Sequence, residues 1–213
     1  MRMHATYAAA LIVAGATITT LAQTSAPPAS PRGTASAQVS GTWATQDGRQ
    51  RYSGGKWITI DYGRPLLRGR ATIFGAGADY GKVVSAGAPV WRAGANATTA
   101  LSTEVPLVFG GKTIAAGTYS VFVELKEQGW TFVLSSQPVQ EKYDPNDKVK
   151  LFGAYNYDAK YDVVRVPMKM AKSPVSVEQF TIGFVNMTQV GGSIAMWWDK
   201  DLATVDFTVG SGS

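Results

Sequence analysis

Hydrophobic and polar residues alternate with a period of two along much of the chain. Successive side chains of a β-strand point to opposite faces, so this alternation predicts strands with one buried face. Lys56–Tyr62, for example, places Ile58, Ile60 and Tyr62 on one face. The same pattern predicts strands at Thr118–Leu125, Trp130–Ser135, Asp162–Met168, Glu178–Val185, Ser193–Trp198 and Ala203–Val209. No long window has the period of about 3.6 residues that is typical of an amphipathic helix.

Turn-forming residues punctuate the chain between strand-like segments. They are Asp47-Gly48, Gly110-Gly111, Gln128-Gly129, Gly191-Gly192 and Asp199-Lys200-Asp201. Such residues accept positive φ or form local side-chain hydrogen bonds, so we expect hairpins there. Many short strands joined in this way predict an antiparallel sandwich or a small barrel, because a single sheet cannot cover its own apolar face. We favour an all-β fold, an antiparallel β-sandwich with Gly-rich hairpin turns.

The first residues have the features of a secretory signal peptide. Met1–His4 carries a positive charge, Ala5–Ile18 is largely apolar, and Thr20-Leu21-Ala22 provides small residues for cleavage. The apolar run is shorter than the roughly 20 residues that a membrane-spanning helix needs. We therefore expect an exported protein, periplasmic or secreted, with no transmembrane segment after signal cleavage. The expected divisions are a signal peptide at 1–22, a short linker at 23–29, a single β-sandwich domain at 30–209 and a tail at 210–213.

The composition removes much of catalytic chemistry. The chain has no cysteine, and its one histidine, His4, lies in the expected signal peptide. This inventory excludes from the exported molecule a Ser-His-acid triad, a cysteine nucleophile, an imidazole or thiolate zinc site and His-ligated haem or copper. We expect no catalytic residue, no metal and no cofactor. The net charge of +5, or +4 without Arg2, is mild and scattered, so nucleic acid is not an expected partner.

A carboxylate-based hydrolase acting on envelope carbohydrate is the enzymatic alternative. It requires two acids about 5 to 9.5 Å apart in one cleft, and the acids considered for it are Asp79, Glu104 and Asp162. The aspartates that begin at Asp144 lack the alternating spacing, central glycine and final glutamate of a calcium-binding EF-hand loop. They predict a solvated loop rather than a metal site.

Arginines alternate with glycines and aromatic residues between Tyr62 and Thr99. Glycine allows close backbone approach, arginine offers a planar fork to a carboxylate or phosphate, and Trp and Tyr offer stacking faces. The alternative is that these arginines tie loops to backbone carbonyls and internal acids. The candidate ligand-binding residues are Tyr62, Arg64, Arg70, Tyr80, Trp91, Arg92, Asn96 and Thr98.

Ordered blocks in and beyond this region carry a family resemblance. The blocks are Tyr62–Pro65, Arg68–Gly75, Tyr80-Gly81, Trp91–Thr99, Gly111–Phe122, Trp130-Thr131, Tyr161–Val166 and Val177–Ile182. They resemble the bacterial domain of unknown function 2911 family, and the resemblance extends from about Ser30 to Val209. It implies export and brings no established activity. It also implies that Ala35–Val39 belongs to the opening strand of the domain, with 42–56 as an inserted hairpin or loop.

Two segments depart from the family pattern. Val83–Pro89 lengthens the passage from Tyr80-Gly81 to Trp91-Arg92, and Phe152-Gly153 stands where Trp-Gly is usual. If a pocket lies at this end of the sandwich, the longer passage would reshape its rim. The leading hypothesis is a non-catalytic envelope protein that binds an unknown ligand or envelope partner there. A structural or assembly module with a wide exposed apolar patch is a further alternative.

Overall fold

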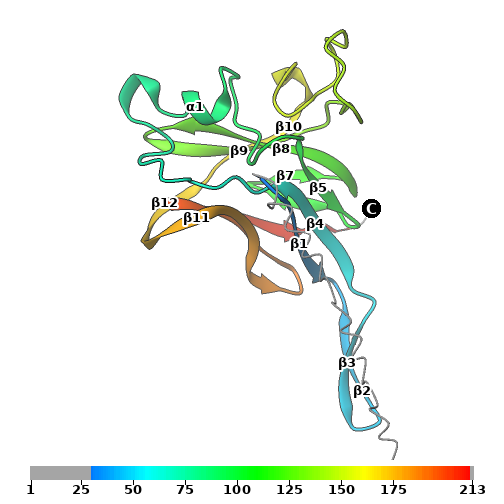
Figure 1. The fold of residues 1–213 in the computed structure, drawn as a ribbon. Coiled ribbons are helices and arrows are strands. Elements are labelled where there is room, and N and C mark those ends of the chain that lie inside the picture. Colours follow the sequence, from blue (N-terminus) through cyan, green and yellow to red (C-terminus); the bar gives the residue numbers. More distant parts are fainter. Residues whose placement is uncertain (1–29, 212–213) are drawn as a thin grey trace, which may run out of the picture.

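Two antiparallel sheets pack face to face in the computed structural model, which describes residues 30–211 (Figure 1). The expected signal peptide at 1–22 and linker at 23–29 lie outside the described residues. The first sheet contains β1 (Arg32–Val39), β4 (Lys56–Gly63), β5 (Thr99–Thr103), β8 (Gly117–Lys126), β9 (Gly129–Ser135) and β10 (Asp162–Pro167), in that order. The second has the order β11 (Lys169–Thr188), β12 (Gly191–Val209), β6 (Leu107–Phe109) and β7 (Lys112–Ile114). The predicted all-β sandwich is confirmed.

The alternating apolar residues fill the space between the two sheets, as the sequence predicts. Ile58 and Ile60 of β4, Phe132 and Leu134 of β9, and Phe180 of β11 are each at most 1% exposed. Burying side chains of this size stabilises the fold by roughly 1.5–3 kcal/mol each. The core therefore depends on residues from strands distant in the sequence.

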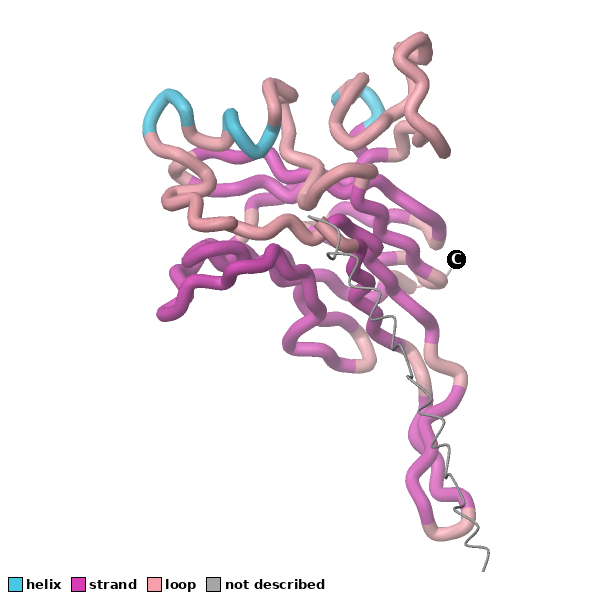
Figure 2. The backbone as a smooth tube through the Cα atoms, viewed as in Figure 1, coloured by secondary structure: helices cyan, strands magenta, loops and turns pink. Residues whose placement is uncertain are grey.

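Loops cover part of the outer face of the six-stranded sheet. Phe122 and Val133, which point away from the main core, are fully buried in a second cluster with Val90, Leu151 and Ala154. Figure 2 shows the loops over this side of the sheet, including α1 (Lys82–Ser85) and the 3-10 turns at Gly77–Asp79 and Ala159–Tyr161. No helix within residues 30–211 is long and apolar enough to cross a membrane.

The predicted turn at Asp199-Lys200-Asp201 is wrong, because β12 continues through it as one strand. Its partner β11 advances from Lys172 to Val177 while β12 passes only from Asp201 to Asp199. Asp199 also adopts a left-handed φ of 51°. The additional residues of β11 form an irregularity of the bulge type, which bends a strand pair without reversing its direction.

A separate hairpin projects from the sandwich (Figure 1). It consists of β2 (Thr42–Gln46) and β3 (Arg49–Ser53), which pair with each other and lie between β1 and β4 in the sequence. Its turn is Asp47-Gly48, with φ values of 52° and 73°. Positive φ at both central residues is typical of a type I′ hairpin turn, which Asp-Gly favours.

Candidate functional site

A cleft lies where both sheets meet the loop that follows β4, and we call it the sheet cleft. Its volume is about 760 Å³. Its walls come from the loop around Thr72–Tyr80, the turn between β8 and β9, and the paired strands β11 and β12. The lining residues are Thr72–Gly75, Tyr80, Glu127–Trp130, Met170–Lys172 and Asp199–Asp201.

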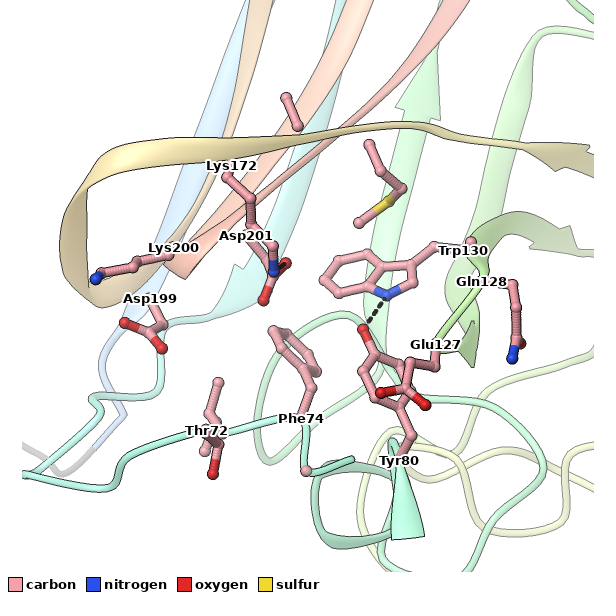
Figure 3. Close-up of a pocket in the computed structure, with 15 residues that line it drawn as sticks. Thr72, Phe74, Tyr80, Glu127, Gln128, Trp130, Lys172, Asp199, Lys200 and Asp201 are labelled. Carbon is pink, nitrogen blue, oxygen red and sulfur yellow. Dashed lines mark hydrogen bonds and ion pairs between the residues drawn. The ribbon is translucent and has the colours of Figure 1, made fainter. Parts of the chain in front are cut away.

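Aromatic rings form the floor of the sheet cleft (Figure 3). The ring centroids of Phe74 and Trp130 are 4.6 Å apart in an edge-to-face arrangement. Both side chains are almost fully buried, with exposed fractions of 4% and 2%. Tyr80 is half-buried beside them, and Met170, which also lines the cleft, is 38% exposed. The cleft therefore offers apolar contact mainly through Tyr80 and Met170, supported by the two buried rings.

Local hydrogen bonds hold the loop that contributes Phe74 and Tyr80. The backbone N–H of Gly75 donates to the carbonyl of Thr72 at 2.7 Å, and the N–H of Gly81 donates to the carbonyl of Phe74 at 2.6 Å. These bonds fold the segment back on itself, so both aromatic side chains face Trp130 of β9. Burial is the main cause that raises the pKa of Tyr80, so its phenol stays protonated at neutral pH.

Charged groups of both signs surround the floor. Lys172 of β11 and Asp201 of β12 form an ion pair at 2.5 Å, and this contact raises the pKa of Lys172. Asp199 Oδ1 accepts a hydrogen bond from Ser176 Oγ at 2.7 Å. Glu127 Oε2 accepts one from the backbone N–H of Gly77 at 3.1 Å. Each carboxylate of the cleft therefore already has a partner from the protein.

The three acids considered for a hydrolase do not line the sheet cleft. Asp79 pairs with Lys82 at 3.0 Å, and Glu104 Oε2 accepts the backbone N–H of Trp57 at 2.8 Å. Asp162 Oδ2 accepts from Tyr157 at 2.6 Å and from Arg165 at 2.8 Å. Within the cleft, Asp201 is engaged by Lys172 in an ion pair. In the described part of the chain, no group of three or more His, Cys, Asp or Glu side chains is placed to hold a metal ion.

Tyr62, Arg64 and Thr98, three of the sequence-predicted site residues, bond to the protein itself. Tyr62 is 3% exposed; its Oη donates to the carbonyl of Ile182 at 3.2 Å and accepts the N–H of the same residue at 2.9 Å. Arg64 donates to the carbonyl of Phe180 at 3.4 Å and to Thr181 Oγ1 at 3.2 Å. These contacts tie β4 to β11. Thr98 is 8% exposed and donates to the carbonyl of Gly153 at 3.1 Å.

Four other predicted residues come together in a second pocket of about 270 Å³, which we call the arginine pocket. Its lining residues are Pro65, Arg70, Val83, Val84, Ala86, Trp91, Arg92, Gly94, Ala95, Asn96 and Trp198. Trp91 is a core residue, 1% exposed, whose indole N–H donates to the carbonyl of Gly94 at 3.2 Å. Val83, Val84 and Ala86 come from the lengthened passage, so this passage does form part of a pocket rim. Tyr80, the remaining candidate, lies in the sheet cleft instead.

Sequence reasoning missed most of the sheet cleft. Lys172, Asp199 and Asp201 lie on long strands whose alternation is interrupted, and the spacing of the two aspartates predicts a turn. Glu127 directly precedes the predicted hairpin turn Gln128-Gly129, and a turn position gives no sign of facing a cleft. The sequence signal that could have located the cleft is the Trp130-Thr131 block, because Phe74 and Tyr80 both contact Trp130.

A protein-family model described as "Protein of unknown function (DUF2911)" matches residues 44–207. The matched range contains every lining residue of the sheet cleft and of the arginine pocket. Neither the curated proteins nor the solved structures contain a match to the chain. Since the match covers well over half of its length, the chain belongs to the DUF2911 family of proteins of unknown function.

Proposed function

We propose that this protein is an exported, non-catalytic binding protein whose sheet cleft holds a neutral, polyhydroxylated ligand of the carbohydrate class. The observation that carries this proposal is the composition of the cleft. An apolar floor around Phe74, Tyr80 and Trp130 faces a rim of three acids and two lysines. Small-molecule sites typically combine apolar walls with a few polar groups that fix the orientation of the ligand.

The balance of charges on the rim favours a neutral ligand. Lys172 and Asp201 neutralise one another, and Asp199 lies beside the exposed Lys200. A strongly charged ligand would meet groups of its own sign on this rim. Hydroxyl groups can donate to carboxylates and accept from ammonium groups at the same time. A sugar ring also has an apolar face that fits against Tyr80 and Met170.

The bonding of the cleft carboxylates supports a binding role, because it fixes the positions of three acceptors. Glu127, Asp199 and Asp201 each accept a hydrogen bond or ion pair from a neighbouring protein group. Fixed acceptors of this kind orient ligand hydroxyls. Export rests on the N-terminal sequence alone, in which the apolar segment is followed by Thr20-Leu21-Ala22. Periplasmic or extracellular residence follows from that segment.

Titration of the mature chain with a panel of neutral mono- and oligosaccharides, followed by calorimetry and thermal unfolding, tests the proposal. We expect saturable binding and a rise in melting temperature for at least one member of the panel. Lys172→Gln and Asp201→Asn should each weaken that binding by about tenfold, since each removes a charged partner of the ligand hydroxyls. Native mass spectrometry of the purified protein identifies any sugar that is retained.

The same strand pair supplies a matched control. Lys169 and Asp206 form an equivalent ion pair between β11 and β12 but line a different pocket. Lys169→Gln should leave sugar affinity unchanged. Absence of saturable binding across the panel, or an equal loss with both lysine variants, contradicts the proposal. Export is tested separately: cell fractionation and N-terminal sequencing should find a mature chain that begins at Gln23.

A further inference from the structure

The arginine pocket contains two guanidinium groups and no carboxylate among its lining residues. Arg70 and Arg92 both line it, together with Asn96 and apolar side chains. Of the arginines in residues 30–211, Arg165 is the one that forms ion pairs with acids. The positive charge of the arginine pocket is therefore not compensated from within the described protein.

Arg92 is held in a position where an anion would stabilise it. Its Nη1 donates to the carbonyl of Asn96 at 2.8 Å, and the side chain is half-buried. Burial lowers the pKa of Arg92 because the charged guanidinium loses hydration. The bond to Asn96 leaves Nε and Nη2 without a partner in the described chain. An incoming oxyanion would both replace lost hydration and occupy these donors.

Arg70 is fixed on the same pocket by different contacts. Its Nε donates to the carbonyl of Leu67 at 2.9 Å, and its Nη2 donates to the carbonyl of Leu66 at 2.7 Å. The guanidinium carbon lies 5.8 Å from the ring centroid of Trp198. These contacts restrain the side chain and do not use Nη1. Arg70 is thus preorganised, which reduces the entropy lost when a ligand binds.

Apolar side chains form part of the pocket beside the two arginines. Trp198 of β12 is buried and Val84 of α1 is half-buried, whereas Val83 and Arg70 are exposed. The half-buried guanidinium of Arg92 is therefore the donor whose charge-assisted hydrogen bonds gain most from surroundings less polar than water. The volume of about 270 Å³ suits a small group rather than a polymer.

We propose that the arginine pocket binds an oxyanion, the carboxylate or phosphate group of a small organic molecule, between Arg70 and Arg92. A planar guanidinium offers parallel N–H donors that match either group. This site shares no lining residue with the sheet cleft, so it is independent of the function proposed there.

Binding of two probes to the mature chain in chloride buffer tests the inference: sodium phosphate and sodium acetate, each titrated at constant ionic strength. We expect saturable binding of at least one probe, observed as localised NMR shifts at the arginine pocket and as a rise in melting temperature. Arg70→Gln and Arg92→Gln should each lower the affinity by roughly tenfold, because each removes a charge-assisted partner. Preference for phosphate indicates a phosphorylated compound, and preference for acetate indicates a carboxylic acid.

Arg49→Gln is the matched control, since it removes one exposed positive charge from β3, outside both pockets. Arg70→Lys keeps the positive charge but loses the planar guanidinium, and we expect it to weaken binding. It serves as the second variant if a glutamine variant fails to fold. The sheet-cleft variant Lys172→Gln should keep full oxyanion affinity. Lack of saturation with both probes overturns the inference. An equal loss in Arg49→Gln, which marks unspecific charge attraction, or a loss in Lys172→Gln, also overturns it.

Discussion

The indole Nε1 of Trp130 donates a hydrogen bond to the phenolic oxygen of Tyr80 at 2.8 Å (Figure 3). This bond joins β9 to the loop that follows β4 and fixes the floor of the sheet cleft. Trp130 is 2% exposed, so water has little access to its N–H. The position of Tyr80 in the cleft therefore depends on a buried donor that has one protein acceptor.

Tyr80→Phe should destabilise the protein by about 1–3 kcal/mol, because it leaves the buried Trp130 N–H without an acceptor. Urea unfolding measures the difference. Tyr119→Phe is the control, since Tyr119 donates to the carbonyl of Ala115 at 3.1 Å in a solvent-accessible position. Its loss should stay below about 1 kcal/mol because water can replace the bond. Equal losses in the two variants would show that the Trp130 N–H finds another partner.

Stability should fall as the pH rises above the ordinary tyrosine pKa of 10.0. Burial and the hydrogen bond to Asp162 raise the pKa of Tyr157, and burial raises the pKa of Tyr80. Above that pH the unfolded chain has lost these protons while the folded chain still binds them. The unfolded state then binds fewer protons, so the free energy of unfolding decreases with rising pH. Urea unfolding over an alkaline pH series measures this slope.

Tyr157→Phe isolates the largest contribution to that alkaline loss. The variant should show a shallower decrease in unfolding free energy at high pH, since the group with the raised pKa is absent. Tyr155→Phe, which removes an exposed phenol from the same loop, is the matched control. An unchanged slope in Tyr157→Phe would mean that its phenol ionises in the folded protein as it does in the unfolded chain.

The end of β4 approaches the arginine pocket too closely for any side chain larger than that of glycine. A Cβ added at Gly63 would lie 2.1 Å from the backbone oxygen of Ala95. Gly63→Ala must therefore shift backbone, and we expect a loss of about 3 kcal/mol or more in urea unfolding. A Cβ added at Gly69 would contact no other atom, and only the φ of 71° disfavours alanine there. We therefore expect Gly69→Ala to lower the free energy of unfolding by about 1 kcal/mol. If Gly63→Ala and Gly69→Ala lose similar stability, the contact with Ala95 is not the cause of the loss at Gly63.

The sequence allowed the core to be predicted because burial and alternation are local to each strand. Ile58, Ile60 and Phe180 all lie on the faces that their spacing predicts. The early part of β11, around Lys169–Lys172, was missed because its side chains are exposed on both faces and do not alternate. The pairing of that segment with β12 depends on residues far along the chain.

The candidate site was only partly accessible to sequence reasoning for a related reason. The Arg/Gly/aromatic region predicted a pocket-forming end, and Arg70 and Arg92 do share a pocket. Arginines in the same region also donate hydrogen bonds to backbone carbonyls, as Arg64 does to Phe180. Sequence spacing alone cannot distinguish an arginine that lines a pocket from one that binds a carbonyl. Lys172 and Asp201 meet only because a strand pair with shifted register places them opposite each other.

The projecting hairpin β2–β3 should be dispensable for the stability of the sandwich. Its side chains are nearly all exposed, and two hydrogen bonds join Tyr52 to neighbouring segments. The Oη of Tyr52 accepts the N–H of Gly41 and donates to Gln189 Oε1, each at 3.0 Å. Replacing residues 42–53 with a two-residue Asn-Gly turn should change the free energy of unfolding by no more than about 1 kcal/mol, since the shorter connection also lowers the entropy of loop closure.

Val39→Ala is the contrasting variant, because Val39 lies in β1 just before the hairpin and is fully buried. It should cost about 2 kcal/mol through the cavity that it leaves. A hairpin deletion that destabilises the protein as much as Val39→Ala would show that β2 and β3 support the register between β1 and β4.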